Sequence, residues 1–231
     1  MTLKSLTTIL ATTALVAFAA PGFAQDKSGP NVDETATGTP GGVAQFDMAQ
    51  GLYAIAVANK DALMALTAAK LVAEVALTDV KQEKETTTAE GTTEEADAAE
   101  APADAAVMLA SAREFAAGDE TMIGLIEDVE AEGARGRIGG ASRDFSRLPV
   151  GSVDLWKIPF YGNSYAEIGI SGDGDAPLSV VVTDENGNRV GCPARVYDKF
   201  YCDFVPAWNG YFYVKVTNQG RKRNSYYLLT N

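Results

Sequence analysis

The chain has 231 residues and a formal net charge of −12, with 19 Lys and Arg side chains against 31 Asp and Glu side chains. Nucleic acid, which is bound by a basic surface, is therefore excluded as an expected partner. The sequence contains no histidine and only two cysteines. It consequently lacks the usual general base near neutral pH, the commonest metal ligand and the four thiolates of a zinc site. These absences exclude Ser-His-Asp catalysis, Cys-His catalysis and catalysis by a His-bound metal.

Residues 1–24 have the pattern of a secretory signal peptide. Lys4 precedes an apolar stretch over residues 8–20, and the small residues Gly22 and Ala24 mark a cleavage site before Gln25. The alternative, a membrane anchor, needs about 20 apolar residues, which is more than this stretch provides. We expect an exported protein, periplasmic or secreted, without a transmembrane segment after cleavage.

Composition divides the next part of the chain into four segments. Residues 25–43 are rich in Gly, Pro and small polar residues, and we expect them to form a disordered leader. Residues 44–134 are Ala-rich with helical periodicity, and Asp61 is expected to cap one of the helices. The helical region is interrupted by residues 81–106, an acidic low-complexity segment that we expect to be a disordered linker. Residues 135–147, which contain several Gly and Arg, are expected to act as a hinge.

Apolar side chains alternate with polar ones in short runs over residues 148–231, as in strands that bury one face. Turn sequences such as Asn186-Gly187 and Asn209-Gly210 separate the runs. This pattern predicts an antiparallel β-sandwich of the jelly-roll type. The predicted fold class is therefore α+β in segregated domains, with Ala-rich helices first and the sandwich at the C-terminus.

Nine residues separate Cys192 from Cys202. In an oxidising compartment a lone pair of cysteines at this spacing is expected to form a structural disulfide. The alternative is a free catalytic thiol, for which the sequence offers no histidine as the activating base.

Five segments occur in order in the C-terminal part: 171–175 (SGDGD), 178–188 (LSVVVTDENGN), 202–207 (CDFVPA), 210–218 (GYFYVKVTN) and 224–231 (NSYYLLTN). Together they resemble the bacterial pre-peptidase C-terminal domain, a jelly-roll β-sandwich related to the collagen-binding domains of clostridial collagenases. The resemblance spans about residues 146–231. It implies a non-catalytic accessory domain of exported proteins, a domain often attached to proteases and sometimes able to bind calcium. The helical part resembles no family that we can name.

The chain departs from this family at the residues that would carry calcium. The family commonly continues its Gly-Asp turn with Asp-Leu-Asp-Leu, whereas this chain has Ala-Pro-Leu-Ser after Asp175. Oxygen ligands remain at Asp173, Asp175, Asp184 and Asn186, and we hypothesise a weak calcium site if their loops converge. The alternative for Asp184 and Asn186 is an ordinary Asn-Gly hairpin turn. No other cofactor is expected.

Four aromatic side chains are candidates for ligand binding, namely Trp208, Tyr211, Tyr213 and Tyr227. Exposed aromatic rings stack on sugar rings or peptide chains, although such residues also serve as ordinary strand residues. We hypothesise a non-catalytic binding protein of the cell envelope that recognises a protein or a glycan through the sandwich. The alternative is a structural or assembly subunit whose helices pair with a partner protein. An enzyme that uses Asp and Glu alone, as glycosidases do, is not expected, because no inward-facing carboxylate pair is readable.

Overall fold

The computed structural model describes residues 27–89, 100–132, 138–193 and 197–231. The predicted signal peptide lies outside the described residues. Within them the chain forms four helices, which are α1 (Gly42–Asn59), α2 (Ala62–Glu74), α3 (Ala105–Ala116) and α4 (Glu120–Glu132). Nine strands follow or separate them, namely β1 (Val75–Asp79), β2 (Glu83–Thr87), β3 (Ile138–Leu148), β4 (Val153–Phe160), β5 (Ala166–Gly172), β6 (Leu178–Asp184), β7 (Lys199–Phe204), β8 (Gly210–Asn218) and β9 (Asn224–Thr230). The predicted α+β fold class is confirmed.

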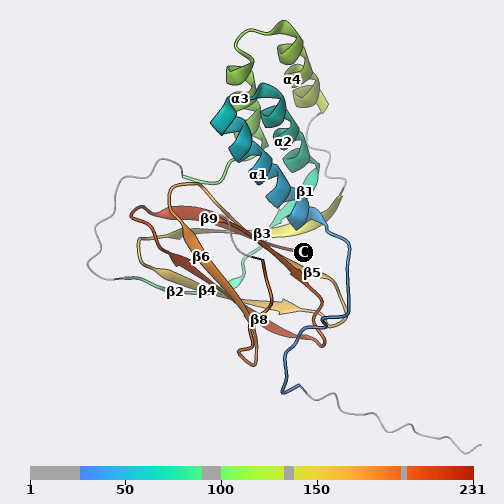
Figure 1. The fold of residues 1–231 in the computed structure, drawn as a ribbon, viewed down its shortest axis with the longest axis vertical. Coiled ribbons are helices and arrows are strands. Elements are labelled where there is room, and N and C mark those ends of the chain that lie inside the picture. Colours follow the sequence, from blue (N-terminus) through green and yellow to red (C-terminus); the bar gives the residue numbers. More distant parts are fainter. Residues whose placement is uncertain (1–26, 90–99, 133–137, 194–196) are drawn as a thin grey trace, which may run out of the picture.

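The strands form two sheets that make a sandwich, with the helices at one side of it (Figure 1). The five-stranded sheet has the order β1-β3-β9-β5-β7, and the four-stranded sheet has the order β2-β4-β8-β6. Neighbouring strands are antiparallel, except that β1 runs parallel to β3. A parallel pair needs a long crossover connection, and the chain between β1 and β3 supplies one that contains α3 and α4.

The sandwich core lies between the two sheets and follows the predicted alternation. Trp156 and Ile158 of β4 and Phe212 and Val214 of β8 are buried there, while the residues between them point outward. Because side chains alternate across a strand, the same sequence that fills the core also determines which side chains lie on the outer faces.

Helix α1 begins on the outer face of the five-stranded sheet (Figure 1). Val43 and Phe46 of α1 are buried against this sheet in one cluster with Leu229 of β9, and the ring of Phe46 packs edge-on to that of Tyr227. Gly169 of β5 permits the close approach, since a Cβ atom at this position would lie 2.8 Å from a methyl carbon of Val43. Strand β5 is consequently buried on both faces.

Glu167 of β5 caps the N-terminus of α1. The N-cap residue Gly41 has no side chain to do so, and the Oε1 atom of Glu167 accepts hydrogen bonds from the backbone N–H groups of Gly41 (3.0 Å) and Ala44 (3.2 Å). The same oxygen accepts a hydrogen bond from the hydroxyl of Tyr201 at 2.9 Å. Burial and hydrogen bonds to Tyr165 and Glu167 raise the pKa of Tyr201, so the hydroxyl stays protonated and donates. A negative charge at a helix N-terminus also interacts favourably with the helix dipole.

We expect Glu167→Ala to lower the free energy of unfolding by about 2 to 4 kcal/mol, because it leaves three buried or half-buried donors without their acceptor. Urea unfolding of a protein that comprises residues 25–231 measures the loss. Glu114→Ala on the exposed surface of α3 is the control, and its effect should stay within about 0.5 kcal/mol. Equal unfolding midpoints for the two variants would show that Glu167 does not hold α1 on the sheet.

The predicted disordered leader is wrong for residues 27–41, which lie along one end of the sandwich (Figure 1). Asn31 is fully buried there: its backbone N–H donates to Asp184 at 2.8 Å, and its side-chain oxygen accepts from the backbone N–H of Trp208 at 2.9 Å. The low hydrophobicity of this segment predicts disorder. A prediction from hydrophobicity alone takes no account of hydrogen bonds between the segment and buried polar groups, and these bonds hold it in place.

The predicted disordered linker over residues 81–106 is wrong at Glu83–Thr87, which form β2 and pair with β4. Lys84 points inward, with its Nζ atom 4.9 Å from the centre of the Trp156 ring and 3.4 Å from the buried carboxylate of Asp154. Thr86 also donates to Asp154. The inward side chains of Lys84 and Thr86 thus attach an acidic, Thr-rich strand to the buried Asp154. Amino-acid composition alone does not reveal this alternation of inward and outward residues.

The predicted hinge over residues 135–147 is wrong from residue 138 onward, because these residues belong to β3. Strand β3 pairs with β9 from Ser142 to Leu148. The Arg143 side chain pairs with Asp79 of β1 at 2.7 Å and lies over the Tyr227 ring at 4.7 Å. Arg143, one of the residues that favoured a hinge, is therefore used in contacts between strands.

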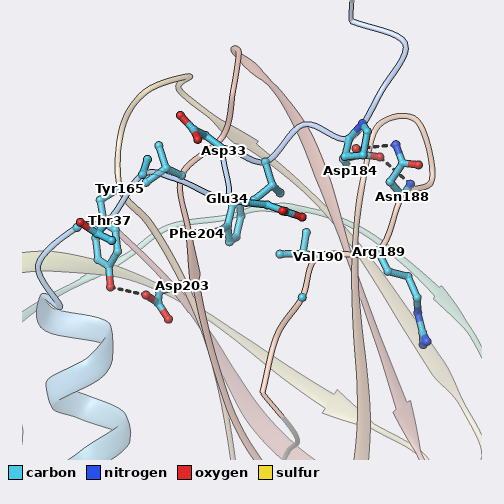
Figure 2. A pocket seen from close by; sticks show the side chains of 16 residues that line it. Asp33, Glu34, Thr37, Tyr165, Asp184, Asn188, Arg189, Val190, Asp203 and Phe204 are labelled. Carbon is cyan, nitrogen blue, oxygen red and sulfur yellow. Dashed lines mark hydrogen bonds between the residues drawn. The ribbon is translucent and has the colours of Figure 1, made fainter.

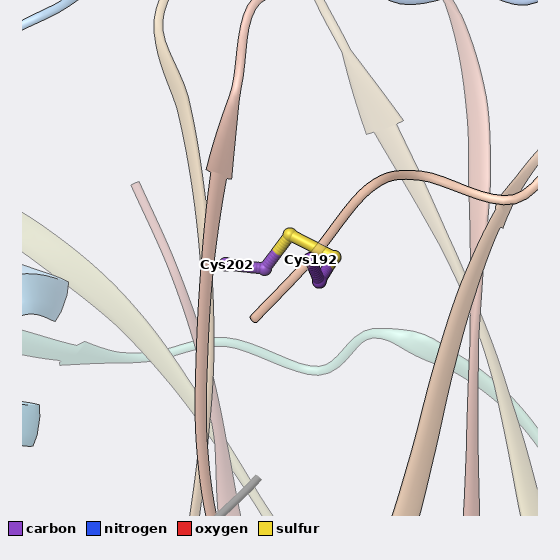
Figure 3. The surroundings of a disulfide bond; sticks show 2 residues. All are labelled: Cys192 and Cys202. Carbon is purple, nitrogen blue, oxygen red and sulfur yellow. A yellow bond between two sulfur atoms is a disulfide. The ribbon is translucent and has the colours of Figure 1, made fainter. Parts of the chain in front are cut away.

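The predicted disulfide between Cys192 and Cys202 is confirmed (Figure 3). It joins the segment that follows β6 to strand β7, at the side of the sandwich where these two edge strands lie. Part of this segment turns back along β6, where the Val190 N–H donates to the Val182 carbonyl. The disulfide therefore links the segment after β6, a strand of the four-stranded sheet, to β7 of the five-stranded sheet.

Candidate functional site

The outer face of the four-stranded sheet presents a row of tyrosines and lysines. We call this surface the tyrosine face, and it comprises Leu155, Lys157 and Pro159 of β4, Tyr211, Tyr213 and Lys215 of β8, Ser179, Val181 and Thr183 of β6, and Tyr161 just beyond β4. These side chains are exposed or half-buried, whereas their neighbours in sequence on β4 and β8 are buried in the core. The alternation of side chains across each strand brings them together.

A shallow hollow of about 280 Å³ lies at one end of the tyrosine face. It is lined by Pro159, Phe160, Tyr161, Asn209, Gly210 and Tyr211. The side chains of Tyr161 and Tyr211 are 76% and 47% exposed, although Phe160 behind them belongs to the core. Two accessible aromatic rings beside an amide side chain form a surface on which a flat, partly apolar ligand can stack.

A cation lies against one of these rings. The Lys157 Nζ atom is 4.5 Å from the centre of the Tyr211 ring, and it is 3.2 Å from a carboxylate oxygen of Glu83 on β2. The Glu83 carboxylate raises the pKa of Lys157 above its ordinary value, which keeps the ammonium charged. The tyrosine face thus combines stacking surface with a fixed positive charge.

Only two of the four predicted aromatic residues share this face. Trp208 is 7% exposed, and its indole N–H donates to Glu185 at 2.6 Å. Tyr227 lies on the outer face of the other sheet, against Phe46 of α1 and beneath Arg143. The four candidates therefore do not share one surface, because strand alternation does not tell which sheet a strand joins or what covers that sheet.

Tyr161 is the residue that sequence reasoning missed. It directly follows the alternating run of β4 and precedes Gly162. The signal in the sequence is the alternation along β4. Phe160 points inward, so the next residue, Tyr161, is expected to point outward.

The four predicted calcium ligands lie at opposite ends of the sandwich. Asp173 and Asp175 are in the turn before β6, whereas Asp184 ends β6 and Asn186 follows it. The length of the strand separates the two pairs by about 20 Å, so they do not form one site. Among the described residues, no three Asp, Glu or Cys side chains gather in a metal-binding arrangement.

Hydrogen bonds within the protein use the carboxylate oxygens of Asp173 and Asp184. The Asp173 carboxylate accepts from the backbone N–H groups of Asp175 (3.0 Å) and Ser225 (2.7 Å), and burial raises its pKa. The Asp184 carboxylate accepts from the backbone of Asn31, and from both the backbone and the side chain of Asn188. These carboxylates therefore shape turns and tie down the residues before α1.

A pocket of about 610 Å³ lies between residues 30–38 and the end of the sandwich (Figure 2). Val190, Phe204 and neighbouring valines form its apolar part. Asp203 lies at one side and accepts a hydrogen bond from the Tyr165 hydroxyl at 2.9 Å, as Figure 2 shows. Sequence reasoning missed this pocket because one of its walls was assigned to a disordered leader.

We expect the Asp184 carboxylate to stabilise the fold above the ordinary aspartate pKa of 3.8 and to lose this effect in acid. Burial raises the pKa of Asp184, but the hydrogen bonds from Asn31, Asn186 and Asn188 outweigh it and lower the pKa overall. A lowered folded-state pKa means that stability is lost as the pH falls through that pKa. The difference in the free energy of unfolding between the wild type and Asp184→Asn should therefore become smaller as the pH falls from about 5 to about 2.

Urea unfolding at several pH values measures this gap. Asp128→Asn on the exposed surface of α4 serves as the control, and its free energy of unfolding should stay close to that of the wild type at every pH. A gap for Asp184→Asn that stays constant down to pH 2 would contradict the assignment.

Comparison with known protein families and with curated protein sequences gave no match to this chain. Among solved structures, the chain is similar to the pre-peptidase C-terminal domain of a collagenase from Bacillus anthracis. The two are 16% identical with a TM-score of 0.34, and the match covers 38% of this chain and 87% of that domain.

Proposed function

We propose that the protein is a non-catalytic binding protein of the cell envelope, and that it recognises a glycan or a protein through the tyrosine face. The observation that carries the proposal is the unequal covering of the two sheets. Helix α1 packs on the five-stranded sheet, whereas the four-stranded sheet presents Tyr161, Tyr211 and Lys157 to solvent. Exposed aromatic clusters on a rigid sheet mark binding surfaces.

The chemistry of the chain supports binding without catalysis. It has no histidine, and β4, β6 and β8 contribute hydroxyls, rings and ammonium groups to the tyrosine face, with Glu83 and Glu85 of β2 along its edge. A location in the periplasm or outside the cell is part of the proposal. Its support is the Cys192–Cys202 disulfide, since structural disulfides persist in oxidising compartments. None of the described helices is both long and apolar enough to cross a membrane.

We expect the double variant Tyr161→Ala/Tyr211→Ala to bind at least tenfold more weakly than the wild type, because it removes both stacking rings. The probes are purified peptidoglycan sacculi and a polysaccharide fraction of the bacterial envelope, each tested by co-sedimentation. Tyr197→Ala is the matched control, since Tyr197 is 49% exposed and lies outside the tyrosine face. Binding that is absent from the wild type, or equal in the two variants, would contradict the proposal.

The alternative function, an assembly subunit that acts through its helices, is favoured by a different observation. Met48 and Ile55 on α1 and Leu63 on α2 are exposed apolar side chains, and α3 and α4 pack mainly on other helices. Helices that need a partner to cover such surface are only marginally stable without it.

Under this alternative we expect amide hydrogens in α3 and α4 to exchange at least about 100-fold faster than those in β5 and β9. Hydrogen exchange of the mature chain, read by mass spectrometry, measures the difference. Equal protection of helices and central strands would contradict the assembly function and leave the tyrosine face as the candidate interface.

A further inference from the structure

We propose that the pocket between residues 30–38 and the end of the sandwich binds an aliphatic polyamine (Figure 2). A ligand of this class carries two or more ammonium groups that are joined by short hydrocarbon chains. The pocket shares no lining residue with the tyrosine face, so this inference goes beyond the proposed function.

The wall that residues 30–38 provide is held against the sandwich along its length. Asn31 is buried and hydrogen-bonded to Asp184, and the backbone N–H of Asp33 donates to the Val205 carbonyl at 2.8 Å. Further along, Gly38 lies against the ring of Tyr165, which a Cβ atom at this position would overlap. The pocket is thus part of the folded protein, and its volume of about 610 Å³ lies in the range of small-molecule sites, roughly 300 to 1,000 Å³.

Carboxylates outnumber cations in the lining of this pocket. The described residues that line it include Asp33, Glu34, Asp184 and Asp203, against the single guanidinium of Arg189, and none of the described lysines lines it. In Figure 2 the Arg189 side chain extends away from the labelled carboxylates of Asp33, Glu34 and Asp203. Charge complementarity therefore favours a cationic ligand.

Two of these carboxylates keep oxygen atoms available for a ligand. Glu34 is exposed and forms no hydrogen bond or ion pair with any described residue. Asp203 is also exposed and uses only its Oδ2 atom, which accepts from the Tyr165 hydroxyl at 2.9 Å. Asp184 is different, because it is buried and its oxygens accept hydrogen bonds within the protein. Glu34 and Asp203 are therefore the residues that we expect to pair with ammonium groups.

An apolar surface lies between the two available carboxylates. Val32 and Val190 are half-buried beside Phe204, and all three side chains pack in or against the sandwich core. In the view of Figure 2, the carboxylates of Glu34 and Asp203 lie on different sides of the Phe204 side chain. Hydrocarbon stems lie along apolar surface while their charged ends stay in water, as lysine side chains show. A ligand with separated charges and hydrocarbon between them matches this arrangement.

The spacing of the carboxylates favours an organic cation over a metal ion. Calcium takes six to eight oxygen ligands that converge on one point. Among the described residues, no three Asp, Glu or Cys side chains gather in such a way. Carboxylates that lie apart are better matched by ammonium groups that are themselves apart.

The test is a two-dimensional NMR titration of an isotope-labelled protein that comprises residues 25–231, with spermidine as the probe. We expect the amide signals of Val32, Glu34, Val190 and Asp203 to shift, with a dissociation constant of about 0.1 mM at low salt that rises with added salt. Magnesium should bind at least tenfold more weakly, because it offers charge without hydrocarbon. Butylamine should also bind at least tenfold more weakly, because it carries one charge.

Two double variants separate the pocket carboxylates from the net charge. Glu34→Gln/Asp203→Asn should weaken spermidine binding about tenfold, which corresponds to about threefold for each exposed charge pair. The amide oxygen at position 203 can still accept from Tyr165. Glu114→Gln/Asp128→Asn removes as many charges from the exposed surfaces of α3 and α4, and it should leave the affinity within about twofold of the wild type. Equal unfolding midpoints confirm that both double variants keep the fold.

Each contrary outcome overturns a stated part of the inference. No shift at about 10 mM spermidine, shifts confined to residues outside the pocket, or equal affinities of the two double variants would overturn the site. Magnesium that binds as tightly as spermidine would overturn the polyamine class. A tri-lysine peptide that binds as tightly would assign the pocket to lysine side chains of a partner protein and overturn the free polyamine. None of these results depends on Tyr161 or Tyr211, so the proposed function is decided by its own experiment.

Discussion

The buried carboxylate of Glu167 determines how the helices and the sandwich are arranged. A single oxygen of this side chain accepts two backbone hydrogen bonds from the start of α1 and one from Tyr201. A buried carboxylate needs hydrogen-bond donors, and these three donors all meet at Oε1, whereas the buried Oε2 atom has no hydrogen-bond partner among the described residues. Because this contact lies on the outer face of the five-stranded sheet, that face is covered and the four-stranded sheet stays accessible.

A second buried carboxylate attaches β2 to the opposite sheet. Asp154 accepts hydrogen bonds from Ser146 and Tyr226, both at 2.6 Å, and Lys84 of β2 lies close to the same oxygen. Burial and the nearby Asp154 raise the pKa of Tyr226 well above its ordinary value, so the tyrosine remains a donor. This network brings residues of both sheets together, and it places the outward residue Glu83 beside Lys157. The electrostatics of the tyrosine face therefore depend on a contact made inside the sandwich.

The sequence predicted part of the candidate site. Tyr211 and Tyr213 alternate with the apolar residues Phe212 and Val214, which predicts that both tyrosines face outward, and the structure places them so. Trp208 and Tyr227 looked equivalent but lie elsewhere, one in contact with Glu185 and the other beneath α1. Asp184 and Asn186 were candidate metal ligands because of their oxygen atoms, but Asp184 uses its oxygens to anchor Asn31, and Asn186 donates to the backbone of Lys27 and Gly29.

Local rules determined the elements that depend on neighbours in sequence. Asp61 accepts from the Met64 N–H as the cap of α2, the alternating runs became β4, β5, β6, β8 and β9, and the two cysteines form the disulfide. Only the tertiary structure decided that residues 27–41 line a pocket, that Glu83–Thr87 form a strand and that α1 covers one sheet. Each of these features depends on a polar contact between residues more than 60 positions apart, such as Asn31 with Asp184 or Lys84 with Asp154. Periodicity and composition report which residues are apolar, but they carry no information about which distant polar group will satisfy a buried charge.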